Sequence, residues 1–255
     1  MSNDLIKKDD LQLALSGIKG ESLGLEEATR SDIKMAVYSL IQPTANEFAA
    51  FAGQFVDRST GESKEKIRCV LLKMNKFRNL WPKPFAPGDK RLCWSTDGKK
   101  PSKDVESPVS EICCFVDPNS HKEEIVCFQA QFDPETNSPA CKLSYTFTAL
   151  DLDTMQPFII SFKGSSVGVI KSLITLIIKH KANLFDAVVT FFAVKPEAIG
   201  KAKGNYFIIQ TDIKWIEEDE TKKSLREIFN QLQGIKPSEI VDKKENTNAA
   251  EEAPF

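Results

Sequence analysis

The sequence contains only two histidines and lacks the short motifs of several common enzyme sites. It has no P-loop, no HExxH pair and no Rossmann glycine pattern. Two histidines leave few ways to build an acid–base pair. These absences favour a protein that binds its partner without turnover, and we predict that it is not an enzyme.

Long hydrophobic runs are also missing. No window approaches the roughly 18 apolar residues of a membrane span, and the first ten residues lack the charged-then-apolar order of a signal peptide. We therefore expect a cytoplasmic protein with no membrane partner. In that compartment the six cysteines indicate reduced thiols or a metal site more than a disulfide framework.

The overall charge does not indicate a nucleic-acid-binding protein, because the formal net charge is −2. Residues 234–255 carry three lysines against five acidic residues, so residues 1–233 sum to zero. The 41% of hydrophobic residues indicate one sizeable core, with or without an insertion. The distribution of charge along the chain therefore matters more than its total.

Hydrophobic periodicity predicts a β-rich domain over residues 31–216. Alternation indicates strands, and one apolar face with a 3.6-residue period indicates a helix over residues 169–178. The predicted strands cover residues 33–40, 67–75, 145–152, 157–162, 184–194 and 205–215. A polar N-terminal arm (1–30) precedes this domain, and a polar helix (217–233) and an acidic tail (234–255) follow it.

This order of elements is that of an OB-fold, the five-stranded Greek-key barrel with a helix between its third and fourth strands. We predict an OB-type α+β barrel with flanking helices. A long cysteine-bearing insertion, residues 77–142, separates its first and second barrel strands. Other mixed α+β folds share the order, and the fold alone does not define a function.

The start of the insertion mixes cations with aromatic side chains. Binding of single strands needs both, because cations neutralise phosphates and aromatic faces stack on unpaired bases. We predict a DNA-binding set of Lys76, Phe77, Arg78, Trp81, Lys83, Phe85, Lys90, Arg91, Trp94, Lys99 and Lys100, with strand-borne partners Lys73, Tyr145, Phe147, Lys163 and Tyr206. The alternative is a solvated basic loop held by its own aromatic residues.

Five of the six cysteines lie between positions 93 and 141. A zinc ion would organise this otherwise irregular segment. The candidate ligands are Cys93, Cys114, Cys127 and Cys141, with His121 as a substitute. No CxxC pair is present, so the alternative of reduced cysteines in a slack loop stays open.

Two acidic clusters, Asp151 with Asp153 and residues 217–220, offer ligands for a divalent ion in a nuclease. A turn and a helix N-terminus explain these clusters more simply.

The sequence ends in Glu251-Glu252-Ala253-Pro254-Phe255. A terminal ring beside its own carboxylate suits capture in a basic-rimmed pocket of another protein. The carboxylates also repel DNA. This pattern looks like the tail of a single-stranded DNA-binding protein, although an ordinary frayed end has the same composition.

Several motifs resemble a family of bacteriophage-encoded proteins with a Cys-x-Ser-x-Asp-Gly signature. The matching segments are Ile41-Gln-Pro, Ala52-Gly-Gln-Phe, Lys76-Phe-Arg with Trp81, Cys93-x-Ser95-x-Asp97-Gly98, Leu150-Asp-Leu-Asp-Thr-Met-Gln-Pro-Phe and Lys163-Gly-Ser-Ser. In plan the chain is similar to phage single-stranded DNA-binding proteins with a zinc-bearing insertion in an OB-fold.

In that family a CxxC-Pro pair and a final Cys follow the Cys-x-Ser-x-Asp-Gly signature. The resemblance therefore implies three zinc ligands here: Cys93 of the signature, Cys114 as the first member of the pair, and Cys141 as the final Cys. This sequence departs from that pattern, because Asp117-Pro118 stands where the second Cys-Pro is expected. Asp117, Cys127 or His121 would complete the set, or the metal is lost.

Taken together, these patterns predict a sequence-independent single-stranded DNA-binding protein of DNA replication, recombination and repair. Its tail residues Glu251, Glu252, Pro254 and Phe255 would recruit partner enzymes in the cytoplasm of the host cell. The alternative functions are a phage structural or assembly protein and, last, a metal-dependent nuclease.

Overall fold

The computed structural model describes Ile6 and residues 35–43, 48–57, 59–82, 90–98, 101–102, 130, 139–199 and 204–232, together with the backbone of residues 114–116 and 125–127. These residues are mainly β, as the sequence predicts. The predicted acidic tail and most of the predicted arm lie outside this range. No helix among the described residues is long and apolar enough to cross a membrane.

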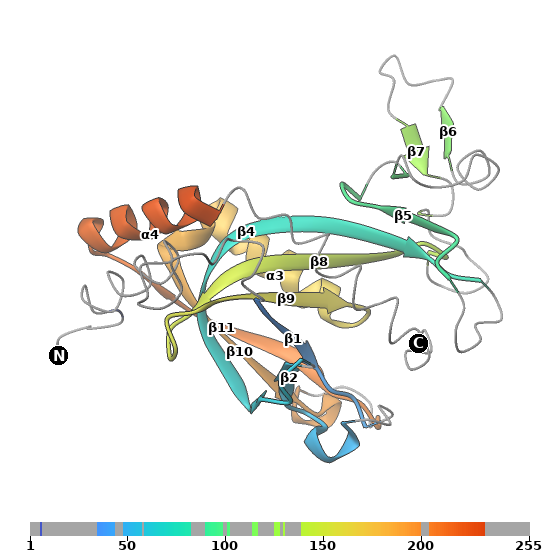
Figure 1. The fold of residues 1–255 in the computed structure, drawn as a ribbon, viewed down its shortest axis with the longest axis horizontal. Coiled ribbons are helices and arrows are strands. Elements are labelled where there is room, and N and C mark those ends of the chain that lie inside the picture. Colours follow the sequence, from blue (N-terminus) through green and yellow to red (C-terminus); the bar gives the residue numbers. More distant parts are fainter. Residues whose placement is uncertain are drawn as a thin grey trace, which may run out of the picture. The chain divides into compact units, whose positions relative to one another are not determined.

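A mixed sheet forms the main part of the structure (Figure 1). Its strands follow the order β11-β10-β4-β8-β9-β1-β2-β3, and β5 also pairs with β4. The bounds are β1 Ala36–Leu40, β2 Phe55–Asp57, β3 Ser63–Lys64, β4 Lys66–Leu80, β5 Cys93–Ser95, β8 Lys142–Asp151, β9 Pro157–Lys163, β10 Ala187–Val194 and β11 Ile208–Trp215. The pairing of β1 with β9 is parallel, whereas β10 pairs antiparallel with both β4 and β11.

The described chain also contains two α-helices, α3 (Ser166–Lys179) and α4 (Asp219–Leu232), and three 3-10 turns, η1 (Ala49–Phe51), η3 (Leu184–Asp186) and η4 (Pro196–Ile199). A separate two-stranded sheet pairs β6 (Cys114–Val116) with β7 (Ile125–Cys127). The strands and the helix predicted between residues 145 and 215 are confirmed. The predicted strand at residue 184 begins three residues later, because the Asp186 carboxylate accepts the Asn183 amide and closes η3.

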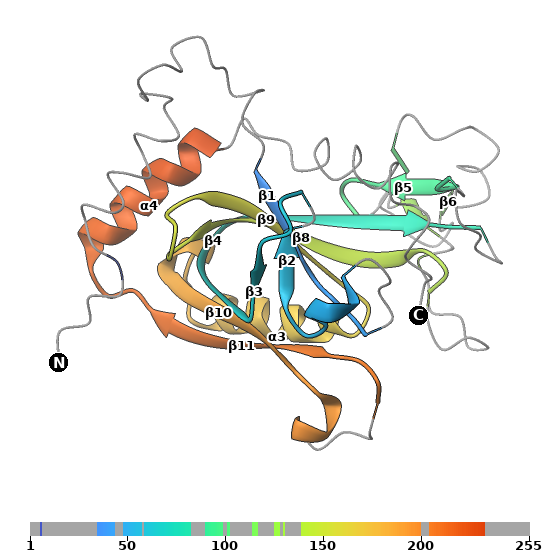
Figure 2. The same cartoon turned by 60° about the horizontal axis from the view of Figure 1, so that its bottom comes forward.

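The chain forms two compact units that alternate along the sequence. Unit 1 comprises residues 1–74, 147–161 and 168–236, and unit 2 comprises residues 75–146, 162–167 and 237–255. Strands β4, β8 and β9 contribute residues to both. In unit 1 the sheet is curled, with β4, β10 and β11 following one another around the curve (Figure 2).

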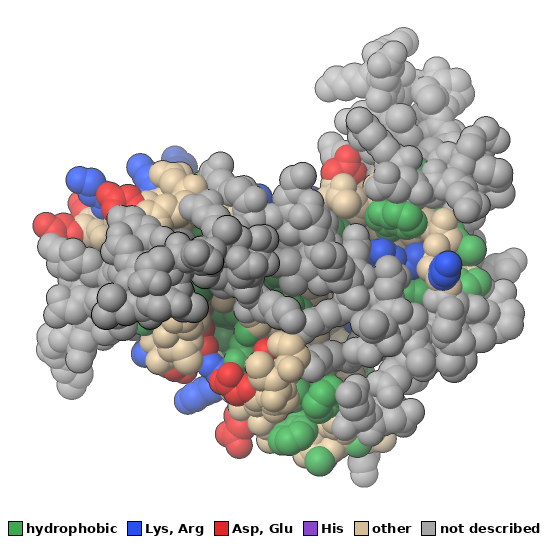
Figure 3. Space-filling view, viewed as in Figure 1, with side chains coloured by type: hydrophobic (Ala, Val, Ile, Leu, Met, Phe, Trp, Pro, Cys, Tyr) green, Lys and Arg blue, Asp and Glu red, His purple; other side chains and the backbone are tan. Residues whose placement is uncertain are grey.

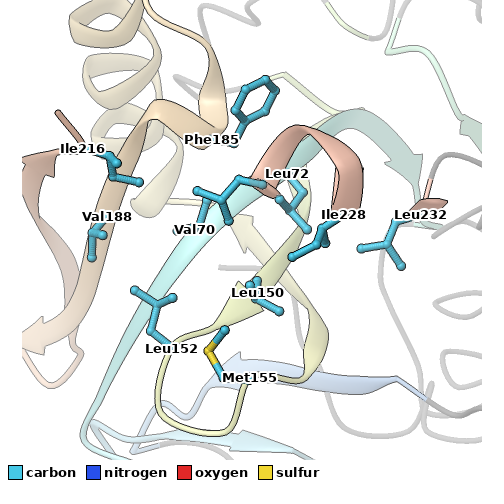
Figure 4. Packing of buried hydrophobic residues seen from close by; sticks show 11 residues of the cluster. Val70, Leu72, Leu150, Leu152, Met155, Phe185, Val188, Ile216, Ile228 and Leu232 are labelled. Atoms are coloured by element: carbon cyan, nitrogen blue, oxygen red, sulfur yellow. The ribbon is translucent and has the colours of Figure 1, made fainter. Parts of the chain in front are cut away.

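The core of unit 1 joins the sheet to α4. Figure 4 shows side chains from β4, β8 and β10 directed toward those of α4. Thr221, Leu225, Ile228 and Leu232 form the buried face of this helix. Their spacing of three to four residues is that of an amphipathic helix. The predicted polar helix therefore carries an apolar stripe that closes the core, and Ile6 of the predicted arm packs against the same cluster.

Helix α3 ends in a Schellman motif. The Ala182 amide donates to the Ile177 carbonyl at 3.2 Å, and the Lys181 amide donates to the Ile178 carbonyl at 2.9 Å. Lys181 occupies the position after the cap with φ +51°. Glycine is the usual residue there, because a Cβ is strained in the left-handed region. The chain thus places a lysine where glycine would be more stable.

The N-terminal motif residues fasten the turn between β1 and β2 to the start of β11. The Gln42 side chain accepts from the Phe207 amide at 2.8 Å and donates to the Phe207 carbonyl at 3.1 Å. Gly53 has φ +88°, and a Cβ there would lie 2.8 Å from the Phe207 ring. Conformation and close approach both require glycine at position 53.

Two glycine variants separate these requirements. Gly61 has φ +76°, and a Cβ added there would have no neighbouring atom within 4 Å, so Gly61→Ala should cost about 1–2 kcal/mol of unfolding free energy. Gly53→Ala should cost about 1–3 kcal/mol more, because the added methyl meets the Phe207 ring. Urea denaturation of both variants measures the difference. Equal midpoints would contradict the packing of Phe207 on Gly53.

Candidate nucleic-acid interface

The described residues of unit 2 carry an excess of positive charge. They include six Lys or Arg, namely Lys76, Arg78, Lys90, Arg91, Lys142 and Lys163, and a single acidic residue, Asp97. The described residues of unit 1 include twelve Lys or Arg and thirteen Asp or Glu. The described part of unit 2 is therefore basic and attracts polyanions locally, whereas unit 2 as a whole carries thirteen Lys or Arg against fifteen Asp or Glu.

The pairing of β4 with β5 sorts the predicted residues onto two faces. Arg78 lies opposite Ser95, Asn79 opposite Trp94 and Leu80 opposite Cys93. Opposed residues share a face, and neighbours along a strand alternate. Asn79 and Trp94 therefore share one face of this ribbon, and Arg78 belongs to the other, together with Lys76 two positions before it in β4. Figure 3 shows hydrophobic side chains beside Lys and Arg side chains in the described part of unit 2.

Arg78 has a structural role. Its Nε donates to the Gly98 carbonyl at 2.9 Å, and one terminal nitrogen donates to the Cys141 carbonyl at 3.0 Å. A guanidinium that bonds two carbonyls of the protein is fixed in place. Arg78 thus ties β4 to the turn after β5 and to the start of β8, and we do not count it as a ligand for phosphate.

The Cys-x-Ser-x-Asp-Gly motif builds the turn after β5. Buried Ser95 donates from its hydroxyl to the Asp97 carboxylate at 2.9 Å. Gly98 has φ +74°, and a Cβ there would lie 3.1 Å from Cβ of Lys76. The motif residues therefore shape the scaffold. Trp94, at the first x position of the motif, lies on the opposite face of the ribbon from Ser95.

Arg91 and Trp94 form the centre of the candidate interface. The Arg91 guanidinium carbon lies 5.0 Å from the centroid of the Trp94 ring, and a terminal nitrogen donates to the Asn79 side chain at 3.1 Å. Both Arg91 and Trp94 are half-buried. A guanidinium held over an indole by a cation–π contact adds positive charge to the aromatic surface. Asn79 is not among the residues that the sequence predicts for the interface. Strand alternation places Asn79 on the face opposite to Arg78 and Leu80, and therefore beside Trp94.

Lys76 and Tyr145 form a second cation–π pair. Lys76 Nζ lies 5.9 Å from the centroid of the buried Tyr145 ring, while the lysine itself is exposed. Nearby, the Ser144 hydroxyl donates to the Phe77 carbonyl at 3.5 Å. Tyr145 therefore positions the Lys76 ammonium and offers little surface of its own.

The remaining predicted DNA-binding residues fall into three groups. In unit 2, Lys90 and Lys163 are exposed and Phe77 and Trp81 are half-buried; in unit 1, Lys73 is half-buried, Tyr206 is 40% exposed and Phe147 is fully buried. The Phe147 ring belongs to the core, so we leave it out of the interface. Lys83, Phe85, Lys99 and Lys100 lie outside the described residues, as do Glu251, Glu252, Pro254 and Phe255.

The predicted metal ligands are described only in part. Cys93 and Cys141 of unit 2 are buried thiols. Cys114 and Cys127 are directly opposite each other in the β6–β7 pairing, an arrangement that their twelve intervening residues did not reveal. His121 and Asp117 lie outside the described residues. Among the residues whose side chains are described, no group of three or more metal ligands is present.

The acidic pair at Asp151 and Asp153 has basic partners that are distant in sequence. Lys64 donates to the buried Asp151 carboxylate, and Arg68 lies 3.2 Å from that of Asp153. The Asp151 carboxylate also accepts the Asp153 amide, which closes the turn between β8 and β9. At the second cluster, Glu218 accepts the Thr221 hydroxyl at the start of α4. These contacts support the interpretation as a turn and a helix N-terminus.

Burial and Asp151 set the titration of the groups around Lys64. Burial alone would lower the pKa of Lys64, but the hydrogen bond and charge of Asp151 raise it above its ordinary value. Burial raises the pKa of Tyr38 to about 12, against the opposing charge of Lys64, whose Nζ lies 5.5 Å from the Tyr38 ring centroid. The thiol of Cys69, also buried, has a pKa well above its ordinary value because of burial and the Asp151 charge. It is therefore not a nucleophile.

The segment at residues 164–168 fits the GxSxG pattern of a hydrolase nucleophile and lies between β9 and α3. Sequence reasoning missed this match. A nucleophile elbow holds its serine in a strained turn with an exposed hydroxyl and a nearby histidine. Ser166 is buried and is not among the residues with positive φ. His180 follows the opposite end of α3. The serine begins the helix, and among the described residues no histidine lies beside it.

In comparisons with known proteins, no family model, no curated protein and no solved structure matches the chain.

The buried cluster around Lys64 makes a testable prediction about tyrosine ionisation. The chain has three tyrosines, and we expect one of them to ionise only near pH 12, because Tyr38 is buried. Absorbance at about 295 nm during alkaline titration measures this step, with circular dichroism to confirm that the protein stays folded. Tyr38→Phe should remove the step and Tyr206→Phe should leave it. Loss of the step in Tyr206→Phe would show that Tyr38 is not the residue that ionises near pH 12.

Proposed function

We propose that this protein binds single-stranded DNA without sequence preference and acts in DNA replication, recombination and repair. The observations that carry the proposal are the excess of cations among the described residues of unit 2 and a guanidinium that lies over an indole. Phosphates and unpaired bases are the two surfaces that every single strand offers, and these two kinds of side chain bind them. Neither contact reads a base edge, so binding would be independent of sequence.

In this proposal the roles divide by exposure and by hydrogen bonding. Lys76 and Lys90 are exposed and neutralise phosphates. A base stacks on the surface made by Arg91 and Trp94, which Asn79 holds in position. Arg78 keeps the scaffold together through its two carbonyl partners. Binding would require no chemical step.

The order of strands supports an OB-type barrel. In an OB-fold the sheet order is 5-4-1-2-3, with the helix between strands 3 and 4. The order β11-β10-β4-β8-β9, with α3 between β9 and β10, corresponds to it strand by strand. The long insertion then lies between β4 and β8. The departure is at the seam, where β9 pairs with β1 in place of the fifth strand.

Two parts of the proposal rest on sequence alone. The acidic tail, ending in Pro254-Phe255, recruits replication or repair enzymes by offering a ring and carboxylates to a basic pocket. A structural zinc ion in the insertion would be held by Cys93, Cys114, Cys127 and Cys141. The opposed positions of Cys114 and Cys127 favour their acting as a pair.

Salt dependence tests the binding of phosphates. Oligo-dT should quench the tryptophan fluorescence of the full chain, with an affinity that falls steeply as salt rises. The double variant Lys76→Ala with Lys90→Ala should reduce the slope of log affinity against log salt by about 0.7 for each phosphate that is no longer neutralised. Lys66→Ala with Lys223→Ala, two exposed lysines of unit 1, is the charge-matched control. Equal slopes for the two double variants would argue against the interface in unit 2.

A second test addresses stacking. Trp94→Ala should weaken binding of oligo-dT by about 1–3 kcal/mol, the usual contribution of one stacked base. Trp94→Phe keeps an aromatic face and should retain most of the affinity. Fluorescence anisotropy of a labelled oligonucleotide reads both variants without depending on the removed tryptophan. Equal affinities of the two variants would exclude stacking at this position.

A further inference from the structure

A second aromatic pair, in unit 1, has no place in the proposed interface. The His180 and Trp215 rings stack with centroids 4.4 Å apart and planes inclined by 33°. His180 caps the end of α3, and Trp215 is the last residue of β11. Trp215 is half-buried while His180 is exposed. The histidine ring therefore has one side against the indole and presents an aromatic surface to solvent.

Cations and an apolar residue border this stack. Lys179 and Lys181 flank His180 in sequence, and both are exposed. Leu176, whose carbonyl accepts the His180 amide at 3.1 Å, lies one turn earlier and is 37% exposed. In the part of the chain that the structure describes, the His180 ring nitrogens and the Trp215 indole nitrogen have no hydrogen-bond partner. Stacked rings, flanking ammonium groups and available ring nitrogens are thus gathered at one corner.

The backbone at Lys181 gives an independent indication. Its φ of +51° lies in the left-handed region, where glycine would avoid the strain of a side chain. Residues held in such conformations cluster at binding sites, where the function of the side chain offsets the cost of the backbone strain. Helix termination alone needs no lysine there, and Lys179 already supplies positive charge at the last turn. The residue held there adds a second ammonium group next to His180 in sequence.

We propose that His180, supported by Trp215 and flanked by Lys179 and Lys181, is a second contact point for single-stranded nucleic acid. A base stacks on the exposed side of His180, and the two ammonium groups neutralise the adjoining phosphates. The assignment rests on the proposed function of the chain. It places a contact in unit 1, whose overall charge gives no sign of nucleic-acid binding.

An acidic peptide is the other ligand with negative charge and rings, but the arrangement favours nucleic acid. The aromatic surface is a flat stack at the molecular surface, and a flat platform suits the face of a base. Peptide side chains are usually bound in pockets that enclose them.

A reporter variant separates this contact from the interface in unit 2. Trp81→Phe with Trp94→Phe keeps aromatic rings in unit 2 and leaves Trp215 as the one tryptophan. Titration of this full-length variant with oligo-dT should change the Trp215 emission in a saturable manner. Titration with poly-glutamate at equal charge and salt should leave it unchanged. An equal response to poly-glutamate would overturn the assignment to nucleic acid.

Variants at positions 180 and 181 then test the roles of the side chains. In the wild-type background, His180→Ala should weaken binding of long oligo-dT by about tenfold, the loss expected for one stacked base. His180→Phe should retain that affinity. Lys181→Gly should raise the Tm by about 2–4 °C, because it relieves the strained φ, and should still weaken binding severalfold. A more stable Lys181→Gly protein with unchanged affinity would show that the lysine has no part in binding.

Failure of this inference is distinguishable from failure of the proposed function. If Trp81 and Trp94 respond to oligo-dT in the wild type while Trp215 stays silent in the reporter, the chain binds single strands and the second contact is wrong. If no tryptophan responds, both proposals are overturned. A Trp215 response that survives Lys76→Ala with Lys90→Ala, at a higher ligand concentration, would support a contact of its own in unit 1.

Discussion

The pairing of β4 on both of its edges is the constraint on which the rest of the structure depends. Its neighbours in the sheet are β10 and β8, and its C-terminal end also pairs with β5. Within unit 1, Cys69, Val70 and Leu71 are buried without alternation, as expected of a strand covered on both faces. Within unit 2 the same strand becomes polar, with exposed Lys76 between half-buried Asn75 and Phe77. One strand thus supplies core residues to unit 1 and residues of the candidate interface to unit 2.

Most of the elements could be predicted from the sequence, because residues 145–215 alternate or repeat with clear periods. The prediction was weaker where contacts between residues distant in sequence determine the length of a strand, the buried face of a helix or the partner of a side chain. It ended the second strand before Phe77, yet β4 continues to Leu80 because β5 supplies hydrogen-bond partners to a segment of polar residues. The apolar stripe of α4 was overlooked since charged residues dominate its composition. Asp151 was assigned to a turn without a basic partner, because Lys64 is 87 positions away.

The composition of the sequence identifies the segment of the candidate interface, but it does not predict how the side chains of that segment are arranged. Cations mixed with aromatic residues identify the segment, and the DNA-binding roles of Lys76, Arg91 and Trp94 stay predictions. Composition cannot tell which donors are occupied within the protein. Arg78 is such a case, because its donors serve two carbonyl groups. The stack of His180 on Trp215 was beyond sequence reasoning, since the end of a helix and the end of a strand 35 positions later give no joint signal.

The register of β4 with β10 also constrains how the chain is made. Val70 pairs with Val188, which follows it by 118 positions. At about 5–20 residues per second on the ribosome, the earlier strand waits roughly 6–24 s for this neighbour. During that interval Val70, Leu71 and Leu72 form an apolar stretch whose edge is open to other nascent chains. The sheet thus keeps one edge of β4 unpaired until β10, in the last third of the chain, has been made.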